Sequence, residues 1–400
     1  MDDERTTAPL AGLRVLDLSQ MLAGPLCAMR LGDLGADVVK VEPPGTGEWT
    51  RSHGFANAAI MGETTALLGL NRNKRSAAID LKSEQGRALF RELAHHADVV
   101  VQNFRVGTAE RLGVGYEELH ELNPRLVYCQ ISGYGEDGPY RDRPGQDLLV
   151  QGYSGAMWSV GAQGDGPAAS PVWAADAMTA YQACIGILAA LRERETSDLG
   201  QKVSIDMWSV MLDCQSQELV TYLNTGALPQ RSAEPFAHVW CNPPYGAFQT
   251  ADGYVLLSQV PIDQLGEALD DDVLREISDW QEAHSRRDEI RRRVAAVTPT
   301  KTTEEWLRIF DSKRLWSAPV YTYADIEVDP HVAARKMIID VDHPLIGRLR
   351  MPAPPIRLSR SEVSVRKAPP LLGADTDEVV EEWLGTEPKS SITSTRQGNE

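Results

Sequence analysis

Apolar positions near the start of the chain follow the order of a strand, a helix and a second strand. Residues 13–18 form a short apolar run, which is typical of a buried strand. Gly24-Pro25 opens a helical pattern of apolar residues over 26–34, and Gly35-Ala36 ends it. A second apolar run, 37–42, follows directly. A strand, a helix and a strand within about 30 residues predict a right-handed parallel crossover.

The same alternation continues further along the chain. Ser83 is placed to cap a helix that carries apolar residues over 89–93, and 98–102 has the pattern of the next strand. A short helix over 116–122 and a strand over 125–131 follow. Alternating strands and helices predict an α/β domain with a mostly parallel sheet.

The second half of the chain has a different pattern. A long helix is expected over 177–195 and a strand over 201–205. Proline and glycine become frequent around 242–246, Ala251-Asp252-Gly253 predicts a hairpin turn, and charged helical segments occupy 259–312. These patterns predict a large domain over 8–218, a smaller α+β domain over 219–324, further strands and a helix over 325–385, and a disordered tail over 386–400.

Composition and charge narrow the classes of partner. Of the 400 residues, 42% are hydrophobic and 24% are charged, which is ordinary for a soluble globular protein. The net charge of −17 argues against nucleic acids and membranes as partners, because nucleic acids and anionic membranes bind basic surfaces. The five cysteines form no C-x-x-C pair, which favours reduced thiols and a cytoplasmic location. The first residues contain no apolar signal segment, and no uninterrupted apolar run reaches the ~18 residues of a membrane span.

Common catalytic and nucleotide-binding motifs are absent from the sequence. It has no G-x-G-x-x-G after the first strand, no P-loop, no H-E-x-x-H and no G-x-S-x-G. The turn over 19–25 could still present backbone amides to an anion at a helix start. His95-His96 has no partner at the spacing of a metal site, so we expect no bound metal.

Asp176 is the carboxylate that most deserves a chemical interpretation. It stands directly before the most apolar helix of the chain. One interpretation is an N-cap, in which the side chain accepts hydrogen bonds from amides at the helix start. The other is a carboxylate nucleophile, which the helix dipole and the free amides would keep ionised. The two interpretations are compatible, and the residues alone do not choose between them.

Basic side chains gather in short segments of this acidic chain. They occur over 72–82, at Arg105 with Arg111, and at Arg141 with Arg143. Such groups suit phosphates, which they can hold by charge-assisted hydrogen bonds. They equally suit a solvated surface, so both interpretations stay open.

Taken together, the motifs resemble those of the class III CoA-transferases, the L-carnitine dehydratase and bile-acid-inducible type, which include formyl-CoA:oxalate CoA-transferase. The longest matching segment begins Gly32-Asp33-Leu34-Gly35-Ala36-Asp37 and runs to residue 44. Each segment alone is weakly specific, whereas their order and spacing together are specific to the superfamily. The other matching segments are 10–17, 22–25, 73–76, 79–82, 102–105, 133–135, 138–140, 186–191, 200–203 and 250–253.

The resemblance implies an enzyme that moves coenzyme A from an acyl-CoA to a free carboxylic acid, without a permanently bound cofactor. It also implies a homodimer of two interlocked rings, in which each chain has a smaller domain and a Rossmann-like large domain to which 325–385 return. Asp176 aligns with the family's catalytic aspartate, which forms mixed anhydride and aspartyl-CoA thioester intermediates. The implied coenzyme A contacts fall on Leu22, Ala23, Ile79, Asp80, Leu81, Lys82, Asn103, Phe104, Arg105, Arg111, Arg143 and Gln146.

Three departures from the oxalate-type enzymes disfavour oxalate and formyl-CoA as substrates. This chain has Leu22 where they have glutamine and Gln146 where they have tyrosine, and 240–265 contain no glycine-run loop. A 2-methylacyl-CoA racemase of the same superfamily is one alternative, and a non-catalytic acyl-CoA-binding protein is another. The racemases have histidine in a Gly-His-Asp stretch that aligns with Gly145-Gln146-Asp147. Because glutamine cannot serve as the second base, we expect a transferase, although the sequence identifies neither the donor nor the acceptor.

Overall fold

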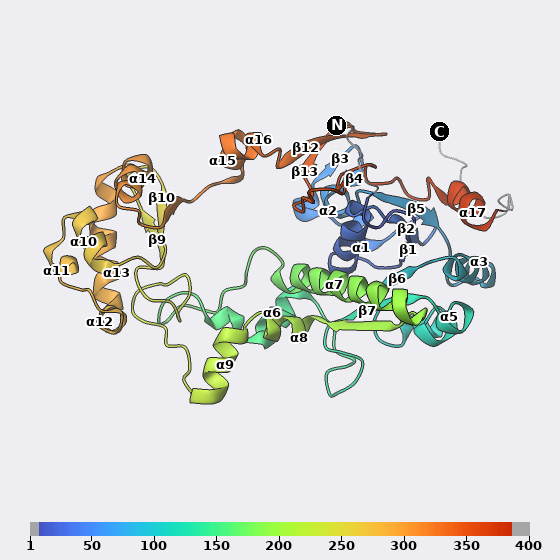
Figure 1. Cartoon of the computed structure of the whole chain (residues 1–400), viewed down its shortest axis with the longest axis horizontal. Helices are drawn as coiled ribbons and strands as arrows, with labels where there is room; N and C mark the ends of the chain where they lie inside the picture. The colour runs from blue at the N-terminus through green and yellow to red at the C-terminus, as the bar shows by residue number, and fades with distance from the viewer. Residues whose placement is uncertain (1–7, 386–400) are drawn as a thin grey trace. The chain divides into compact units, whose positions relative to one another are not determined.

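The computed structural model describes residues 8–385, which divide into two compact units (Figure 1). The large unit comprises the described parts of 1–150, 172–211 and 331–400. The small unit comprises 151–171 and 212–330. The predicted tail over 386–400 lies outside the described residues.

A six-stranded parallel sheet forms the centre of the large unit and confirms the predicted α/β fold. The central strands are mostly apolar on both sides, as expected where helices cover both faces of a sheet. The sequence pattern predicts no strand at 74–78, yet this basic segment forms one edge of the sheet. The strand order is β5-β2-β1-β6-β7-β8, with β1 Arg14–Asp17, β2 Asp37–Glu42, β5 Lys74–Ala78, β6 Val99–Gln102, β7 Val127–Ser132 and β8 Lys202–Asp206.

Helices pack on both faces of this sheet (Figure 1). Successive residues of a strand point to opposite faces, so Val15 of β1 joins one hydrophobic core and Leu16 joins the other. The first core includes α1 and α7, and the second includes α3, α5 and α17. As predicted, Ser83 caps α3 by accepting the Gly86 amide. The bounds are α1 Ala23–Asp33, α3 Glu84–His95, α5 Tyr116–Leu122, α7 Ala174–Ser197 and α17 Thr376–Leu384.

Smaller elements complete the large unit. An antiparallel hairpin, β12 with β13, contributes Leu349 and Met351 to a third hydrophobic cluster that also contains Leu68 of α2. The helix α6 crosses the division between the two units. The bounds are β3 Ala59–Ile60, β4 Glu63–Thr64, α2 Thr65–Leu70, α4 Thr108–Arg111, α6 Asp147–Ser154, α8 Met207–Asp213, α16 Pro330–Ala334, β12 Ile338–His343 and β13 Gly347–Pro352.

The long helix α7 differs from its prediction at the end that matters for the site. It begins at Ala174, before the expected 177, so Asp176 is the third helical residue and does not precede the helix. By length and composition α7 passes the test for a membrane-spanning helix, as core helices of globular proteins also do. Its buried residues, among them Ala180 and Ile187, pack in the first core of the large unit.

The small unit combines a three-stranded antiparallel sheet with short helices. The predicted hairpin turn is confirmed, since the Thr250 amide donates to the Gly253 carbonyl at 2.9 Å between β9 and β10. The charged region 259–312 forms several separate helices that enclose their own hydrophobic core. The bounds are α9 Ser216–Thr225, β9 Gly246–Gln249, β10 Tyr254–Leu257, α10 Ile262–Leu269, α11 Asp272–Arg275, α12 Trp280–Ser285, α13 Arg287–Val297, α14 Thr303–Ser312, β11 Ser317–Pro319 and α15 Tyr323–Val328.

The division between the units differs from the predicted domain boundaries at 151–171. The prediction places this segment in the large domain, 8–218, whereas it belongs to the small unit. The cause is long-range pairing: Gly161 forms a β-bridge with Phe236, and the Gln163 amide donates to the Ser232 carbonyl at 2.7 Å. The small unit ends at 330 and the chain then returns to the large unit, close to the predicted 325.

Candidate active site

The candidate site lies at the carboxyl ends of β1, β6, β7 and β8 in the large unit. The chain passes from β1 through α1 to β2 on one side, and later reaches β6 on the other side. A point where the strand order diverges in this way is the usual binding crevice of an open parallel sheet. A cavity of about 270 Å³ opens there. The predicted site residues that line it are Ala23, Asn103, Phe104, Arg105, Arg111, Arg143, Gln146 and Asp176.

The other predicted coenzyme A contacts lie outside this cavity. Ile79 belongs to the second hydrophobic core, and Leu81 packs partly against it. Leu22 is partly buried and packs against the first core. Asp80 and Lys82 are exposed in the turn after β5, where the Asp80 carboxylate accepts the Lys82 amide at 2.9 Å. A contact from 79–82 to coenzyme A therefore stays a prediction and requires a ligand that extends beyond the cavity.

The basic run at 72–75 is buried and structural, so neither interpretation left open by the sequence, phosphate binding or a solvated surface, holds for it. Arg72 donates two hydrogen bonds to Asp33, at 2.9 and 2.7 Å, and is buried. The Lys74 ammonium group is fully buried and lies 2.8 Å from the Asp17 carboxylate. Because these charges are already paired inside the unit, they are not available to hold phosphates.

Close backbone contacts shape the loops around the cavity. A Cβ atom on Gly145 would lie 2.3 Å from the Cα of Gly133, and one on Gly24 would lie 2.1 Å from the Cβ of Ser19. Neither distance is possible between real atoms, so only glycine allows these approaches. The first contact closes the loop after β7 on itself and sets the start of α6. The second brings the start of α1 against the loop after β1.

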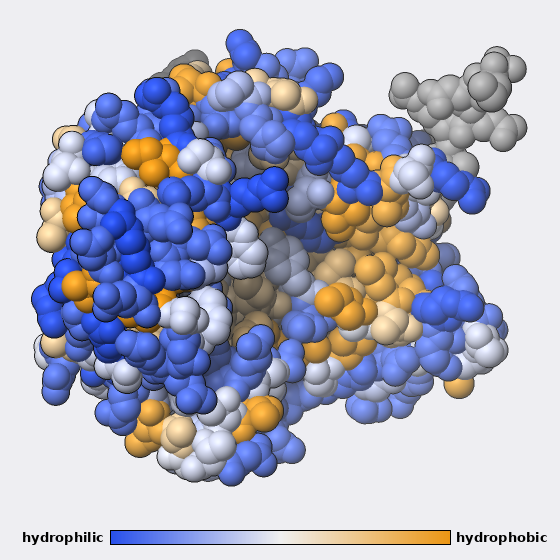
Figure 2. Space-filling model, turned by 60° about the vertical axis from the view of Figure 1, so that its left-hand side comes forward, coloured by the Kyte–Doolittle hydropathy of each residue, from blue (hydrophilic) through white to orange (hydrophobic). Residues whose placement is uncertain are grey.

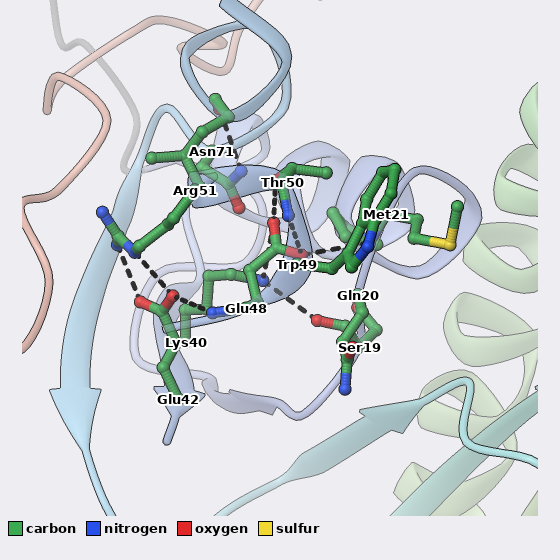
Figure 3. Close-up of polar contacts among 12 residues, drawn as sticks. Ser19, Gln20, Met21, Lys40, Glu42, Glu48, Trp49, Thr50, Arg51 and Asn71 are labelled. Atoms are coloured by element: carbon green, nitrogen blue, oxygen red, sulfur yellow. Dashed lines mark hydrogen bonds and ion pairs between the residues drawn. The ribbon is translucent and has the colours of Figure 1, made fainter. Parts of the chain in front are cut away.

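The loop after β1 is held from several sides (Figure 3). Asn103, which follows β6, exchanges two hydrogen bonds of 2.8 Å with the backbone of Gln20. The buried Lys40 donates to the Ser19 carbonyl at 3.0 Å, and the buried Glu48 accepts the Met21 amide at 3.2 Å. These contacts fix Met21, a cavity-lining residue, with a φ of 67° that non-glycine residues rarely adopt.

Buried charges beneath this loop support it. Two hydrogen bonds of 2.7 Å join Arg51 to the Glu42 carboxylate, and the Glu48 amide also donates to Glu42 at 3.1 Å (Figure 3). Burial raises the pKa of Asp17, but the ammonium groups of Lys74 and Lys40 outweigh this effect and lower the pKa below its ordinary value. These paired charges hold the loop after β1, which forms one wall of the cavity, in a fixed position.

Asp176 reaches the cavity from the first turn of α7, and its N-cap interpretation is wrong. The N-cap position belongs to Trp173, which adopts a left-handed conformation and offers no side-chain acceptor. The Asp176 amide instead donates to the carboxylate of Asp147 at 3.1 Å. Burial, and to a lesser extent the negative charge of Asp147, raises the pKa of Asp176 from 3.8 to about 7. The expectation of a carboxylate held ionised by the helix start is therefore wrong as well.

Several cavity residues were not on the predicted list. Met21, Arg141 and Met207 line the cavity. Asp147 does not line it, but its carboxylate accepts the Asp176 amide. Arg141 belongs to a basic cluster that the sequence does show. Asp147 follows the aligned Gly145-Gln146 pair, but its contact spans 29 residues, and no local pattern indicates it.

The residues that line the cavity bear on two alternatives, a racemase with a histidine base and a metal site. Within residues 8–385, no histidine lines this cavity, and no group of three or more His, Cys, Asp or Glu side chains could hold a metal ion. His53 is exposed and stacks on Trp49, with ring centroids 4.3 Å apart. The arginines Arg105, Arg111 and Arg143 face the same cavity as the Asp176 carboxylate. The arrangement can bind an anionic ligand beside a basic carboxylate.

Comparison with known proteins agrees with this geometry. The chain matches the model of CoA-transferase family III over residues 10–376. It is 33% identical to the mouse succinyl-CoA:glutarate CoA-transferase, covering 94% of this chain and 86% of the relative. It is 36% identical to the succinyl-CoA:mesaconate CoA-transferase of Haloarcula hispanica, covering 93% of this chain and 96% of the relative. A CAIB/BAIF family protein from Brucella suis has a similar structure, with a TM-score of 0.83 and 30% identity over 94% of this chain and all of that chain. The chain therefore belongs to CoA-transferase family III.

Proposed function

We propose that this protein transfers coenzyme A from succinyl-CoA to a free carboxylic acid, with Asp176 as covalent nucleophile. The observation that carries the proposal is a basic, partly buried carboxylate in a cavity lined by Arg105, Arg111, Arg141 and Arg143. Several relatives are named as succinyl-CoA transferases, which supports succinyl-CoA as the donor. The arginines suit the phosphates of coenzyme A and the free carboxylate of a dicarboxylic acyl group.

The first half of the reaction moves the acyl group onto the enzyme and then releases it. A carboxylate oxygen of Asp176 attacks the thioester carbonyl carbon, and cleavage of the C–S bond leaves a mixed anhydride and coenzyme A thiolate. The thiolate then attacks the carbonyl carbon of Asp176 in the anhydride. This step forms an aspartyl-CoA thioester and releases the donor acid as its carboxylate.

The second half repeats these steps in reverse with the acceptor. Its carboxylate attacks the aspartyl thioester, which regenerates an anhydride and the thiolate, and the thiolate takes the new acyl group from Asp176. No proton is gained or lost overall, and every intermediate keeps the energy of the thioester. The cavity must exclude water, because both intermediates hydrolyse.

The raised pKa of Asp176 bears on this chemistry in two ways. A more basic carboxylate is a better nucleophile once it is ionised. A pKa of about 7 also means that the ionised fraction, and with it kcat/KM for the donor, rises with pH up to about that value. This acid limb would be absent from an aspartate with an ordinary pKa.

Steady-state assays test the proposal and its alternatives. The enzyme is supplied with succinyl-CoA and a panel of acids that includes glutarate and mesaconate, and new acyl-CoA is followed by chromatography. Transfer that is lost in Asp176→Ala supports the transferase. Exchange of the α-hydrogen of a 2-methylacyl-CoA for deuterium in D₂O, without transfer, would make Asp176 a general base. Binding of acyl-CoA with neither reaction would mark a binding protein.

We further propose a homodimer of interlocked chains in the cytoplasm. In the large unit, α7 exposes Met178, Tyr181 and Ile185 on one side, and hydrophobic side chains gather on a face of this unit (Figure 2). In the small unit, α9 has no buried residue although it carries Val220 and Leu223. Apolar surface of this kind favours association with a second chain. All five cysteines are free, which supports a reducing compartment.

A further inference from the structure

The helix that carries Asp176 begins without a capping residue of its own. The first amides of a helix have no acceptor inside the helix and need one from elsewhere. Trp173 occupies the N-cap of α7, with φ 50° and ψ 54°, and its side chain makes no cap hydrogen bond. The acceptor comes from another element, because Asp147 Oδ1 accepts the Asp176 amide at 3.1 Å.

Asp147 is well placed to hold this position. It is the first residue of α6 and is only 2% exposed. The loop before it is closed by the backbone contact between Gly133 and Gly145. A buried carboxylate is costly unless polar groups compensate it by hydrogen bonds. Here it contacts the amide of the residue whose side chain faces the cavity.

We infer that Asp147 is a positioning residue for the Asp176 nucleophile: it caps the first turn of α7 from α6 and keeps a second negative charge beside the Asp176 carboxylate. The inference rests on the proposed function of Asp176. The charged groups that line the cavity together with Asp176 are Arg105 and Arg111 after β6 and Arg141, Asp142 and Arg143 after β7, and Asp147 itself is not part of the lining. Of all these, only Asp147 is among the causes of the raised pKa of Asp176.

This arrangement favours the covalent intermediates. In the free enzyme the two carboxylates repel each other. The charge of Asp176 disappears when it becomes an anhydride or a thioester, so acylation relieves the repulsion. Asp147 thus acts on the energy of the nucleophile through its charge, and on its orientation through the hydrogen bond, without touching the reacting atoms.

The two effects are separated by two substitutions. Asp147→Asn keeps an oxygen that accepts the Asp176 amide and removes the charge, whereas Asp147→Ala removes both. Asp377→Asn, at an exposed position in the first turn of α17, is the matched control. Single-turnover formation of acyl-enzyme from succinyl-CoA is measured between pH 5 and 9. In Asp147→Asn the midpoint of the acid limb should move to lower pH, while Asp147→Ala should be slower at every pH by ~10-fold or more.

A second measurement does not depend on turnover. The urea midpoints of the parent protein and of Asp176→Asn are compared at pH 5 and pH 8, first with Asp147 present and then in the Asp147→Asn background. The difference in midpoint between Asp176→Asn and its parent should depend on pH. This pH dependence should shrink in the Asp147→Asn background and stay unchanged in the Asp377→Asn background. If it does not shrink, or the acid limb of Asp147→Asn matches that of the parent, the role of Asp147 is disproved. If it shrinks but no acyl-enzyme forms in the parent, the pairing stands and the proposed nucleophile fails.

Discussion

Replacement of Asp176 by asparagine should stabilise the protein, and the gain should grow with pH. The unfolded chain loses the proton of this carboxyl near pH 4, whereas the folded chain keeps it until about pH 7 because burial and Asp147 disfavour the charged form. Between these values the folded state binds more protons than the unfolded state, so its stability falls as the pH rises. Asparagine has no such proton and escapes the loss.

The magnitude follows from the size of the pKa change. A rise from 3.8 to about 7 corresponds to about 4 kcal/mol when the whole range is crossed, at about 1.4 kcal/mol per unit. Between pH 5 and pH 8 the parent protein should lose about 2 to 3 kcal/mol of unfolding free energy through this group. Partial exposure of Asp176 reduces this loss towards about 2 kcal/mol.

Urea unfolding at one fixed protein concentration measures this difference. The midpoint of Asp176→Asn minus that of the parent should be larger at pH 8 than at pH 5. Asp377→Asn, which removes an exposed helix-start carboxylate, should show no such trend. An equal difference at both pH values, or a less stable Asp176→Asn at pH 8, would refute the reasoning about burial and charge at this site.

Other substitutions test the cavity, the loops and the assembly. Arg105→Ala and Arg111→Ala should each weaken coenzyme A binding by ~1–3 kcal/mol in calorimetry, with an effect that decreases at high salt, and unchanged affinity would remove these residues from the phosphate site. Gly145→Ala should lower the free energy of unfolding by ~1–3 kcal/mol because its Cβ meets the Gly133 backbone, whereas Gly69→Ala, in open space on α2, should be neutral or slightly stabilising. Ile185→Asp, on the exposed side of α7, should shift the mass in light scattering towards the 44.0 kDa chain, and an unchanged mass would place the dimer contact elsewhere.

The sequence predicts the sheet well because its signals are local. The apolar run of β2, 37–42, coincides with the strand, and Ser83 caps α3 as expected. The basic segment 72–75 misled the prediction because Arg72 and Lys74 are neutralised by Asp33 and Asp17, which lie far away in the sequence. Such pairing exists only once β5 has joined the sheet.

Only part of the candidate site could be predicted. Asp176 and the segment after β6 lie together at the cavity, as the resemblance implied. The cap of α7 could not be predicted, since Trp173 takes the N-cap conformation and the acceptor, Asp147, comes from a different helix. The placement of 151–171 likewise depends on its pairing with residues near 236, which no local pattern reveals.

Trapping of the acylated aspartate tests the central claim most directly. The enzyme is incubated with succinyl-CoA and no acceptor, hydroxylamine is added, and peptides are examined by mass spectrometry. The account predicts a hydroxamate at Asp176, absent without succinyl-CoA, together with a loss of at least ~10³-fold in turnover for Asp176→Ala. Coenzyme A transfer at a near-parental rate in Asp176→Ala, with no adduct on Asp176 in the active parent enzyme, would contradict it.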